Sequence, residues 1–251
     1  MSYWQFDLLV LVLPIALLLR GPVRPPVRLG LAVAALSVVA LAWTAPWDEH
    51  LVRTGVWSYG PDRVLATIGS VPVEEYAFVV LLVALVAAWG WRTGRLPTVV
   101  TPDLTPGHRA SGAAAWLGVA VAGAGLLALG GPWRYLGLLL VWVGPPLALQ
   151  RAVAGDLLRA RTVDRMLVGA PVALWLCAAD RLALDDGVWV ISPLSSTGLA
   201  VLGLPLEEAL FFLLVTLLVT DGLFLATDDR ALARARALLR RTGRRRVASR
   251  A

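Results

Sequence analysis

Long runs of apolar residues dominate this chain, and short polar segments separate them. A helix that crosses a lipid bilayer needs about 20 consecutive, mostly apolar residues. Seven segments approach that requirement, namely 3–19, 29–46, 72–91, 111–130, 134–150, 166–183 and 205–225. Two intervening segments, 47–71 and 184–204, contain glycine and proline and have no apolar run long enough to cross. We expect both to be structured or re-entrant loops near the membrane surface, and the chain to be an all-α, polytopic membrane protein with seven transmembrane helices.

The composition agrees with a bundle dissolved in lipid. Of the 251 residues, 58% are hydrophobic and only 16% are charged, whereas about a quarter of the residues in soluble domains are charged. No early basic stretch or small-residue cleavage site precedes the first apolar run, so we expect this run to be retained rather than cleaved as a signal peptide. The single cysteine, Cys177, excludes a disulfide within the chain and a cysteine-based metal cluster. No metal site is predicted.

Arginine predicts the orientation, because the chain contains no lysine. When the polar segments are assigned alternately to the two sides of the membrane, nineteen of the 23 arginines fall on one side, nine of them in the tail. Positive residues favour the cytoplasmic side. We therefore expect the N-terminus to be outside and the C-terminus to be cytoplasmic. We expect the protein to lie in the plasma membrane of a prokaryote. We interpret the basic tail as a contact with anionic lipid headgroups and predict no nucleic-acid partner.

An internal repeat covers most of the chain. The motif Pro72-Val73-Glu74-Glu75 recurs, after one inserted residue, as Pro205-Leu206-Glu207-Glu208. Other residues recur at a shift of 132 positions: Tyr3 and Tyr135, Pro14 and Pro146, Asp48 and Asp180, and Trp57 and Trp189. Self-similarity of this kind indicates a duplicated structural unit. The predicted domains are a first three-helix repeat at 1–92, a linker at 93–133, a second three-helix repeat at 134–226 and a basic cytoplasmic tail at 227–251.

The linker contains the unpaired apolar helix at 111–130. Two units of three helices joined directly would face opposite ways, and one additional crossing restores the orientation of the second unit. The repeats are therefore predicted to be parallel, as in some transporters. Gly123-Ala124-Gly125 with Ala128 formally matches a dinucleotide-binding fingerprint, but no strand precedes it. We predict no bound dinucleotide and no other cofactor.

The duplicated glutamates are the main candidates for chemistry. Proline and glutamate are common in the first turn of any helix, so one copy alone would indicate only a helix start. Two copies at matched positions, each leading into an apolar helix, favour a functional site, because ionisable groups near a span are costly. Glu74, Glu75, Glu207 and Glu208 are the candidate catalytic residues, and Asp48 and Asp180 are candidate supporting residues.

Aromatic residues accompany these acids. Phe78 lies one helical turn beyond Glu74, on the same face of the helix. Phe211 has the same relation to Glu207. A carboxyl group beside an aromatic ring suits a cationic species, and this pairing makes Glu74 and Glu207 the predicted lead acids, with Glu75 and Glu208 as their partners. The candidate substrate-binding residues are Trp57, Phe78, Trp189, Phe211 and Phe212.

The second motif, which continues as Pro205-Leu206-Glu207-Glu208-Ala209-Leu210-Phe211-Phe212, resembles the P-x-E-E-x-x-F-F signature of the membrane-integral lycopene cyclase family. Because the repeat covers nearly the whole chain, the protein resembles the fused form of the heterodimeric enzymes and the cyclase part of fungal bifunctional enzymes. The first motif departs from the signature, since Val79 stands at the position of the second phenylalanine.

The resemblance implies that lycopene is cyclised via γ-carotene to β-carotene without net redox change. A proton adds to a terminal double bond, the carbocation closes a ring and a proton leaves. The implied partners are a hydrophobic carotenoid, the lipid bilayer and, as a further expectation, other carotenoid enzymes.

Two alternatives remain open at this point. One is a cyclase of C50 carotenoids, and the other, from a different class, is a proton-coupled transporter, which parallel repeats and membrane carboxylates would also suit. A retinal protein is excluded because no lysine can form the Schiff base.

Overall fold

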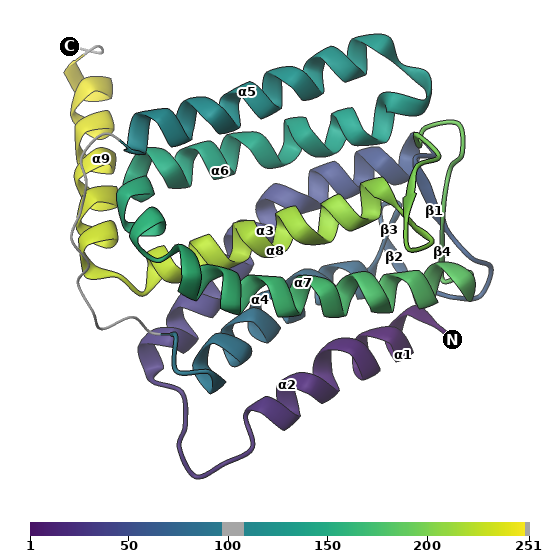
Figure 1. Cartoon of the computed structure of the whole chain (residues 1–251), viewed down its shortest axis with the longest axis horizontal. Coiled ribbons are helices and arrows are strands. Elements are labelled where there is room, and N and C mark those ends of the chain that lie inside the picture. Colours follow the sequence, from purple (N-terminus) through teal and green to yellow (C-terminus); the bar gives the residue numbers. More distant parts are fainter. Residues whose placement is uncertain (97–107, 249–251) are drawn as a thin grey trace.

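The computed structural model describes residues 1–96 and 108–248, and most of these residues are helical (Figure 1). The helices are α1 (Tyr3–Asp7), the π-helical turn η1 (Leu8–Val12), α2 (Leu13–Leu18), α3 (Val27–Arg53), α4 (Val73–Arg92), α5 (His108–Leu129), the 3₁₀ turn η2 (Gly131–Trp133), α6 (Arg134–Ala160), α7 (Thr162–Asp185), α8 (Leu206–Ala226) and α9 (Asp229–Ala248). The strands are β1 (Trp57–Tyr59), β2 (Thr67–Ile68), β3 (Val71–Pro72), β4 (Trp189–Ile191), β5 (Ala200–Val201) and β6 (Leu204–Pro205).

Six of the seven predicted spans are helices long and apolar enough to cross a membrane. They are Val27–Arg53, Val73–Arg92, His108–Leu129, Gly131–Ala160, Thr162–Asp185 and Leu206–Ala226. The protein is therefore a membrane protein with six candidate spans in its described residues. The first predicted span is the shorter apolar helix Tyr3–Leu18, and its crossing of the membrane stays a prediction, as do the parallel arrangement of the repeats and the domain boundaries.

Proline shapes the first helix of each half in the same way. Pro14 has no N–H, so the carbonyl of Val10, four residues earlier, loses its helical partner. Trp175 Nε1 on α7 donates a hydrogen bond of 2.9 Å to that carbonyl. In the second half, Trp43 Nε1 on α3 donates to Trp142 O at 3.3 Å, four residues before the matched proline. These bonds join the two halves, because each tryptophan and its acceptor belong to different repeats.

The predicted linker helix α5 packs against α6 through small residues. A Cβ atom on Gly123 would lie 2.9 Å from Gly137 O, and a Cβ atom on Gly137 would lie 2.9 Å from Gly123 O. A Cβ atom on Gly144 would likewise lie 2.8 Å from the Ala120 side chain. Small residues allow helices to approach closely in lipid. Close helix packing therefore explains why position 123 is a glycine, without any role in nucleotide binding.

Short strands cover one end of the otherwise helical bundle. β1 pairs antiparallel with β4, with Trp57 opposite Ile191 and Tyr59 opposite Trp189. One strand of this ribbon comes from each half of the chain. The hairpins β2–β3 and β5–β6 lead directly into α4 and α8. Both predicted loop segments are therefore structured, and α4 and α8 both begin at the end of the bundle that carries the strands (Figure 1).

The opposite end of the bundle holds arginine ion pairs. Arg28, in the first turn of α3, pairs with Asp229 of α9 at 2.7 Å, and Arg234 of α9 pairs with Asp156 at 2.7 Å. The hydrogen bond to Asp156 raises the pKa of Arg234. The basic tail predicted at 227–251 is thus helical as far as Ala248 and is tied to the bundle by ion pairs near its start.

Candidate active site

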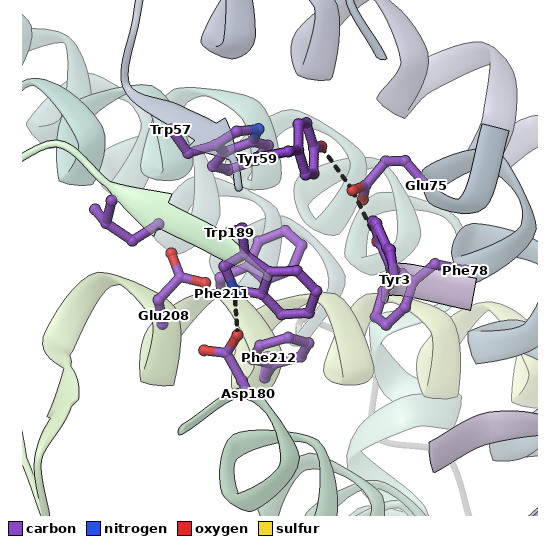
Figure 2. A pocket seen from close by; sticks show the side chains of 11 residues that line it. Tyr3, Trp57, Tyr59, Glu75, Phe78, Asp180, Trp189, Glu208, Phe211 and Phe212 are labelled. Carbon is purple, nitrogen blue, oxygen red and sulfur yellow. Dashed lines mark hydrogen bonds between the residues drawn. The ribbon is translucent and has the colours of Figure 1, made fainter. Parts of the chain in front are cut away.

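A chamber lies beneath the β1–β4 ribbon, between the first turns of α4 and α8. The empty space between its lining residues, open solvent included, is about 410 Å³. Its lining combines carboxyl groups, phenols and aromatic rings from both halves of the chain: Tyr3, Trp57, Tyr59, Glu75, Phe78, Asp180, Trp189, Ile191, Glu208, Phe211 and Phe212 (Figure 2). The two Pro-x-Glu-Glu motifs, which are 133 positions apart in the sequence, therefore meet at a single chamber.

Proline fixes where the glutamates lie. Pro72 and Pro205 are the N-cap residues of α4 and α8, with extended ψ angles of 149° and 139°. Each helix therefore begins immediately after the β-hairpin that precedes it, and both glutamates of each motif fall in its first turn. Successive side chains on a helix are about 100° apart, so the two glutamates of one motif have different surroundings.

Glu75 is held by two phenols. Tyr3 donates a hydrogen bond of 2.8 Å to Glu75 Oε2, and Tyr59 donates one of 3.0 Å to the same oxygen (Figure 2). Burial and the neighbouring Glu75 carboxylate raise the pKa of Tyr59 well above that of a free phenol. Tyr59 therefore stays protonated and remains a donor. Hydrogen bonds to a charged group are the stronger kind, and both favour an ionised Glu75.

Glu208 has another environment. Its neighbour is the carboxyl group of Asp180, whose Oδ1 accepts a hydrogen bond of 2.8 Å from Trp189 Nε1. Among the described residues, no hydrogen bond of standard geometry reaches Asp180 Oδ2, Glu208 Oε1 or the Tyr135 hydroxyl. The Glu208 side of the chamber therefore holds two adjacent buried carboxyl groups, and the Tyr135 hydroxyl lies close to Glu208.

Glu74 and Glu207, the predicted lead acids, are not among the residues that line the chamber. Leu65 N donates to Glu74 Oε1 at 2.8 Å, and Thr197 N donates to Glu207 Oε1 at 2.7 Å. Ser196 Oγ also donates to Glu207, at 3.0 Å. Helical side chains tilt toward the N-terminus, so these first-turn carboxylates reach back to the preceding loop. Their shared role is to hold matching loops of the two halves.

The aromatic candidates do line the chamber, and Trp57, Trp189 and Phe212 each contact a ring from the other half. Trp57 packs edge-on against Tyr135 with ring centroids 5.6 Å apart. Trp189 packs against Tyr3 at 5.1 Å. Phe212 contacts both phenylalanines of the chamber wall, Phe78 at 6.2 Å and Phe211 at 5.1 Å. Each half therefore needs the other to complete its wall.

The supporting aspartates differ from each other. Asp180 lines the chamber, whereas Asp48, its match in the repeat, is buried behind the wall and interacts electrostatically with Glu75. Within the residues that the structure describes, no group of three or more histidine, cysteine or acidic side chains could hold a metal ion.

Three residues that line the chamber are absent from the candidates predicted from the sequence: Tyr3, Tyr59 and Ile191. Tyr3 stood in the repeat alignment as the match of Tyr135, and this signal could have identified it. Tyr59 and Ile191 are themselves 132 positions apart, so they occupy one repeat position with unlike side chains. A search for matched residues passes over such a position.

Comparison with known proteins supports the resemblance seen in the motif. A family model described as lycopene cyclase matches residues 1–89 and 134–222. The chain belongs to the lycopene cyclase family. Because members of this family are cyclases, the chain is an enzyme. The two matched stretches lie within the predicted units 1–92 and 134–226.

Several curated relatives are similar over most of the cyclase. The lycopene beta-cyclase of Halobacterium salinarum is 40% identical over 196 residues, which cover 77% of this chain and 81% of the relative. The bifunctional lycopene cyclase/phytoene synthase of Arthroderma gypseum is 33% identical over 211 residues, covering 76% of this chain and 35% of the relative. The fungal proteins are thus much longer than the region that this cyclase matches. No solved structure matches the chain.

Proposed function

We propose that the protein is a lycopene β-cyclase that converts lycopene through monocyclic γ-carotene to β-carotene. The observation that carries this proposal is the meeting of Glu75 and Glu208, one from each half, at one aromatic chamber. The reaction needs an acid, a lining that tolerates positive charge and a base. The chamber contains residue types suited to all three.

The proton comes from the pair formed by Glu208 and Asp180. Two carboxyl groups in contact, buried together, repel each other when both are charged, so such pairs commonly share a proton. That proton adds to the terminal double bond of the open end group and leaves a carbocation. Glu208 is the donor in this assignment, and Asp180, fixed by Trp189, is its positioning residue.

The carbocation then closes the ring. The electron pair of a nearby double bond in the same molecule forms the new carbon–carbon bond, and the positive charge moves to a ring carbon. The faces of Trp57, Trp189, Phe78 and Phe211 carry negative charge density that stabilises a cation. Because these rings are apolar, they also keep water from trapping the cation as an alcohol.

Glu75 completes the reaction by taking a proton from the ring carbon next to the cation, which forms the ring double bond. The hydrogen bonds from Tyr3 and Tyr59 align its carboxylate and favour the charged form. One proton enters and one leaves, so the step is an isomerisation that requires neither an oxidant nor a reductant. We therefore keep the prediction that no cofactor takes part.

This proposal changes the lead acids predicted from the sequence. Glu75 and Glu208 take the catalytic roles, and Glu74 and Glu207 become positioning residues that hold the loops before α4 and α8. The orientation proposed from the arginine distribution puts the chamber near the outer surface of a prokaryotic plasma membrane. Contacts with other carotenoid enzymes remain an expectation.

Expression in a bacterium that accumulates lycopene, followed by pigment chromatography, tests the proposal. We expect the red lycopene band to give way to γ-carotene and β-carotene. A culture with unchanged lycopene and normal amounts of the protein in its membranes would overturn the β-cyclase assignment. Repeating the assay in cells that make an acyclic C50 carotenoid would then test the alternative substrate, and a ring with a different double-bond position would identify another ring type.

A further inference from the structure

A second cavity begins where the chamber ends. It lies among α3, α4, α6 and α8, and its empty space, open solvent included, is about 920 Å³. Glu75, Phe78 and Phe211 line both spaces, so the two spaces adjoin at these three side chains. Glu75 is the one ionisable residue among those that line the second cavity.

The second cavity runs along the helices toward the arginine end of the bundle. It begins near the hydrogen bond between Trp43 and Trp142. On α8 its lining extends from Phe211 to Val219, which is about 12 Å at 1.5 Å per residue. At its far end, Gln150 lines the cavity and donates to Leu218 O at 2.9 Å. The cavity is therefore a channel of about two helical turns.

The channel opens sideways between α3 and α6. Val39 on α3 and Leu149 on α6 both line it, yet they are 63% and 64% exposed. Both helices pack on α8, which forms the back of the channel. In a membrane protein, side chains exposed at this depth face lipid. A molecule dissolved in the bilayer can thus reach the chamber without passing through water.

We propose that this channel binds the polyene chain of the substrate, which enters between α3 and α6 while its open end group occupies the chamber. The inference rests on the proposed carotenoid cyclase function. Three observations favour a polyene as the occupant: the apolar lining, the three side chains shared with the chamber, and exposed lining residues on the lipid side. The Phe78 and Phe211 rings flank the point where the end group gives way to the chain.

The channel has a consequence for the order of events. One chamber at one end of one channel admits one end group at a time. A substrate cyclised at one end must withdraw into the lipid and return with its other end first. The monocyclic product is therefore released between the two cyclisations.

Filling the channel tests the proposal. Ala40 on α3 lines the channel and is half-buried, so Ala40→Trp would block it. Ala35 on the same helix is exposed and does not line the channel, so Ala35→Trp is the matched control. Each variant is purified in detergent, returned to phosphatidylcholine vesicles and given two substrates. One is lycopene, and the other is a shortened acyclic polyene with the same open end group that fits within the chamber.

We expect Ala40→Trp to cyclise lycopene at least tenfold more slowly and the shortened polyene at nearly the wild-type rate. Ala35→Trp should match the wild type on both substrates. Turnover of the shortened polyene also shows that the variant is folded. Wild-type turnover of lycopene by Ala40→Trp would overturn the channel, and this is also the result expected if only lipid acyl chains occupy it.

Equal loss on both substrates, in a variant that elutes like the wild type on gel filtration, would also overturn the channel, because the block would then act on the chamber. Failure of the proposed function looks different. In that case the wild-type protein itself would cyclise neither substrate, whatever stands at position 40.

Discussion

The two halves of the chamber have the same scaffold and different chemistry. In the first half, Glu75 accepts hydrogen bonds from Tyr3 and Tyr59. In the second half, Glu208 lies beside Asp180, and Ile191 occupies the place that corresponds to Tyr59. The first surroundings favour a carboxylate, and the second favour a shared proton. Duplication thus supplied two equivalent carboxyl positions, and a few unlike neighbours divide the work between them.

The scaffold itself is repeated closely. Tyr3 N donates to Arg63 O at 2.8 Å, and Tyr135 N donates to Ser195 O at 2.9 Å, with each donor and acceptor shifted by 132 positions. The loop bonds of Glu74 and Glu207 repeat in the same way. The backbone bonds that hold the fold are therefore repeated. In the chamber, Glu75 and Glu208 are also matched, whereas Tyr59 and Ile191 differ.

The largest effect is expected for Glu208→Gln. The amide keeps the shape of the side chain but cannot donate the proton that starts the reaction. Loss of a general acid costs about 10²–10⁴-fold in rate, measured as the initial rate of lycopene loss in vesicles. Glu207→Gln is the matched control on the same helical turn. A Glu208→Gln rate within tenfold of the wild type would remove the proposed donor.

Asp180→Asn should have the next largest effect. Asparagine can still accept the hydrogen bond from Trp189 but cannot share a proton with Glu208. We expect the rate to fall about tenfold to a hundredfold, which is less than loss of the acid itself. Asp48→Asn, at the matched position outside the chamber, should change the rate less than tenfold. If the two variants lose the same activity in the same assay, the proposed difference between the halves is wrong.

Tyr59→Phe should have a smaller effect, because Tyr3 still donates to Glu75. One hydrogen bond to a charged group contributes about 1.5–3 kcal/mol, which equals about 10- to 150-fold in rate if it is lost entirely in the transition state. Because the bond from Tyr3 remains, we expect a fall at the low end, about tenfold, in the turnover rate. The raised pKa of Tyr59 keeps its phenol protonated up to alkaline pH. The ratio of the wild-type rate to the Tyr59→Phe rate should therefore stay constant between about pH 7 and pH 9, and a ratio that declines across this range would contradict that assignment.

Glu74→Gln should have the smallest effect on activity. Its amide oxygen can still accept from Leu65 N, but a neutral acceptor forms the weaker bond. A loss of about 1 kcal/mol would lower the melting temperature by about 2–4 °C, with activity within about tenfold of the wild type. Thermal unfolding followed by tryptophan fluorescence gives the first quantity, and pigment turnover gives the second. An inactive variant with an unchanged melting temperature would restore Glu74 as a catalytic acid.

The helices could be predicted from the sequence because a bilayer demands long apolar segments. Their ends could not, since hydropathy gives no signal where a helix continues through polar residues. Thus α3, predicted to end at 46, continues to Arg53, and α6, predicted to end at 150, continues to a kink at Ala154 and resumes to Ala160. The β1–β4 ribbon pairs three-residue strands from the two halves of the chain, and so short a local pattern cannot specify such a distant pairing.

The location of the candidate site could be predicted, but not which glutamates face it. Glu74 and Phe78 do share one face of α4, as their i, i+4 spacing predicts. However, Phe78 lies about 6 Å deeper along the axis, within the bundle, whereas Glu74 reaches back to Leu65. Glu75 is turned by about 100° toward the interior. Spacing on one helix cannot reveal which face the other half will cover.

The central claim is that both glutamates act on the same end group in one chamber. The most direct test is pigment chromatography of lycopene-accumulating cells that express Glu75→Gln with Glu208 intact. We predict that lycopene remains and that neither γ-carotene nor β-carotene forms, because the deprotonation step is lost for either end of the molecule. Accumulation of monocyclic γ-carotene at the wild-type rate would show that the two halves work as separate centres, and would contradict the claim.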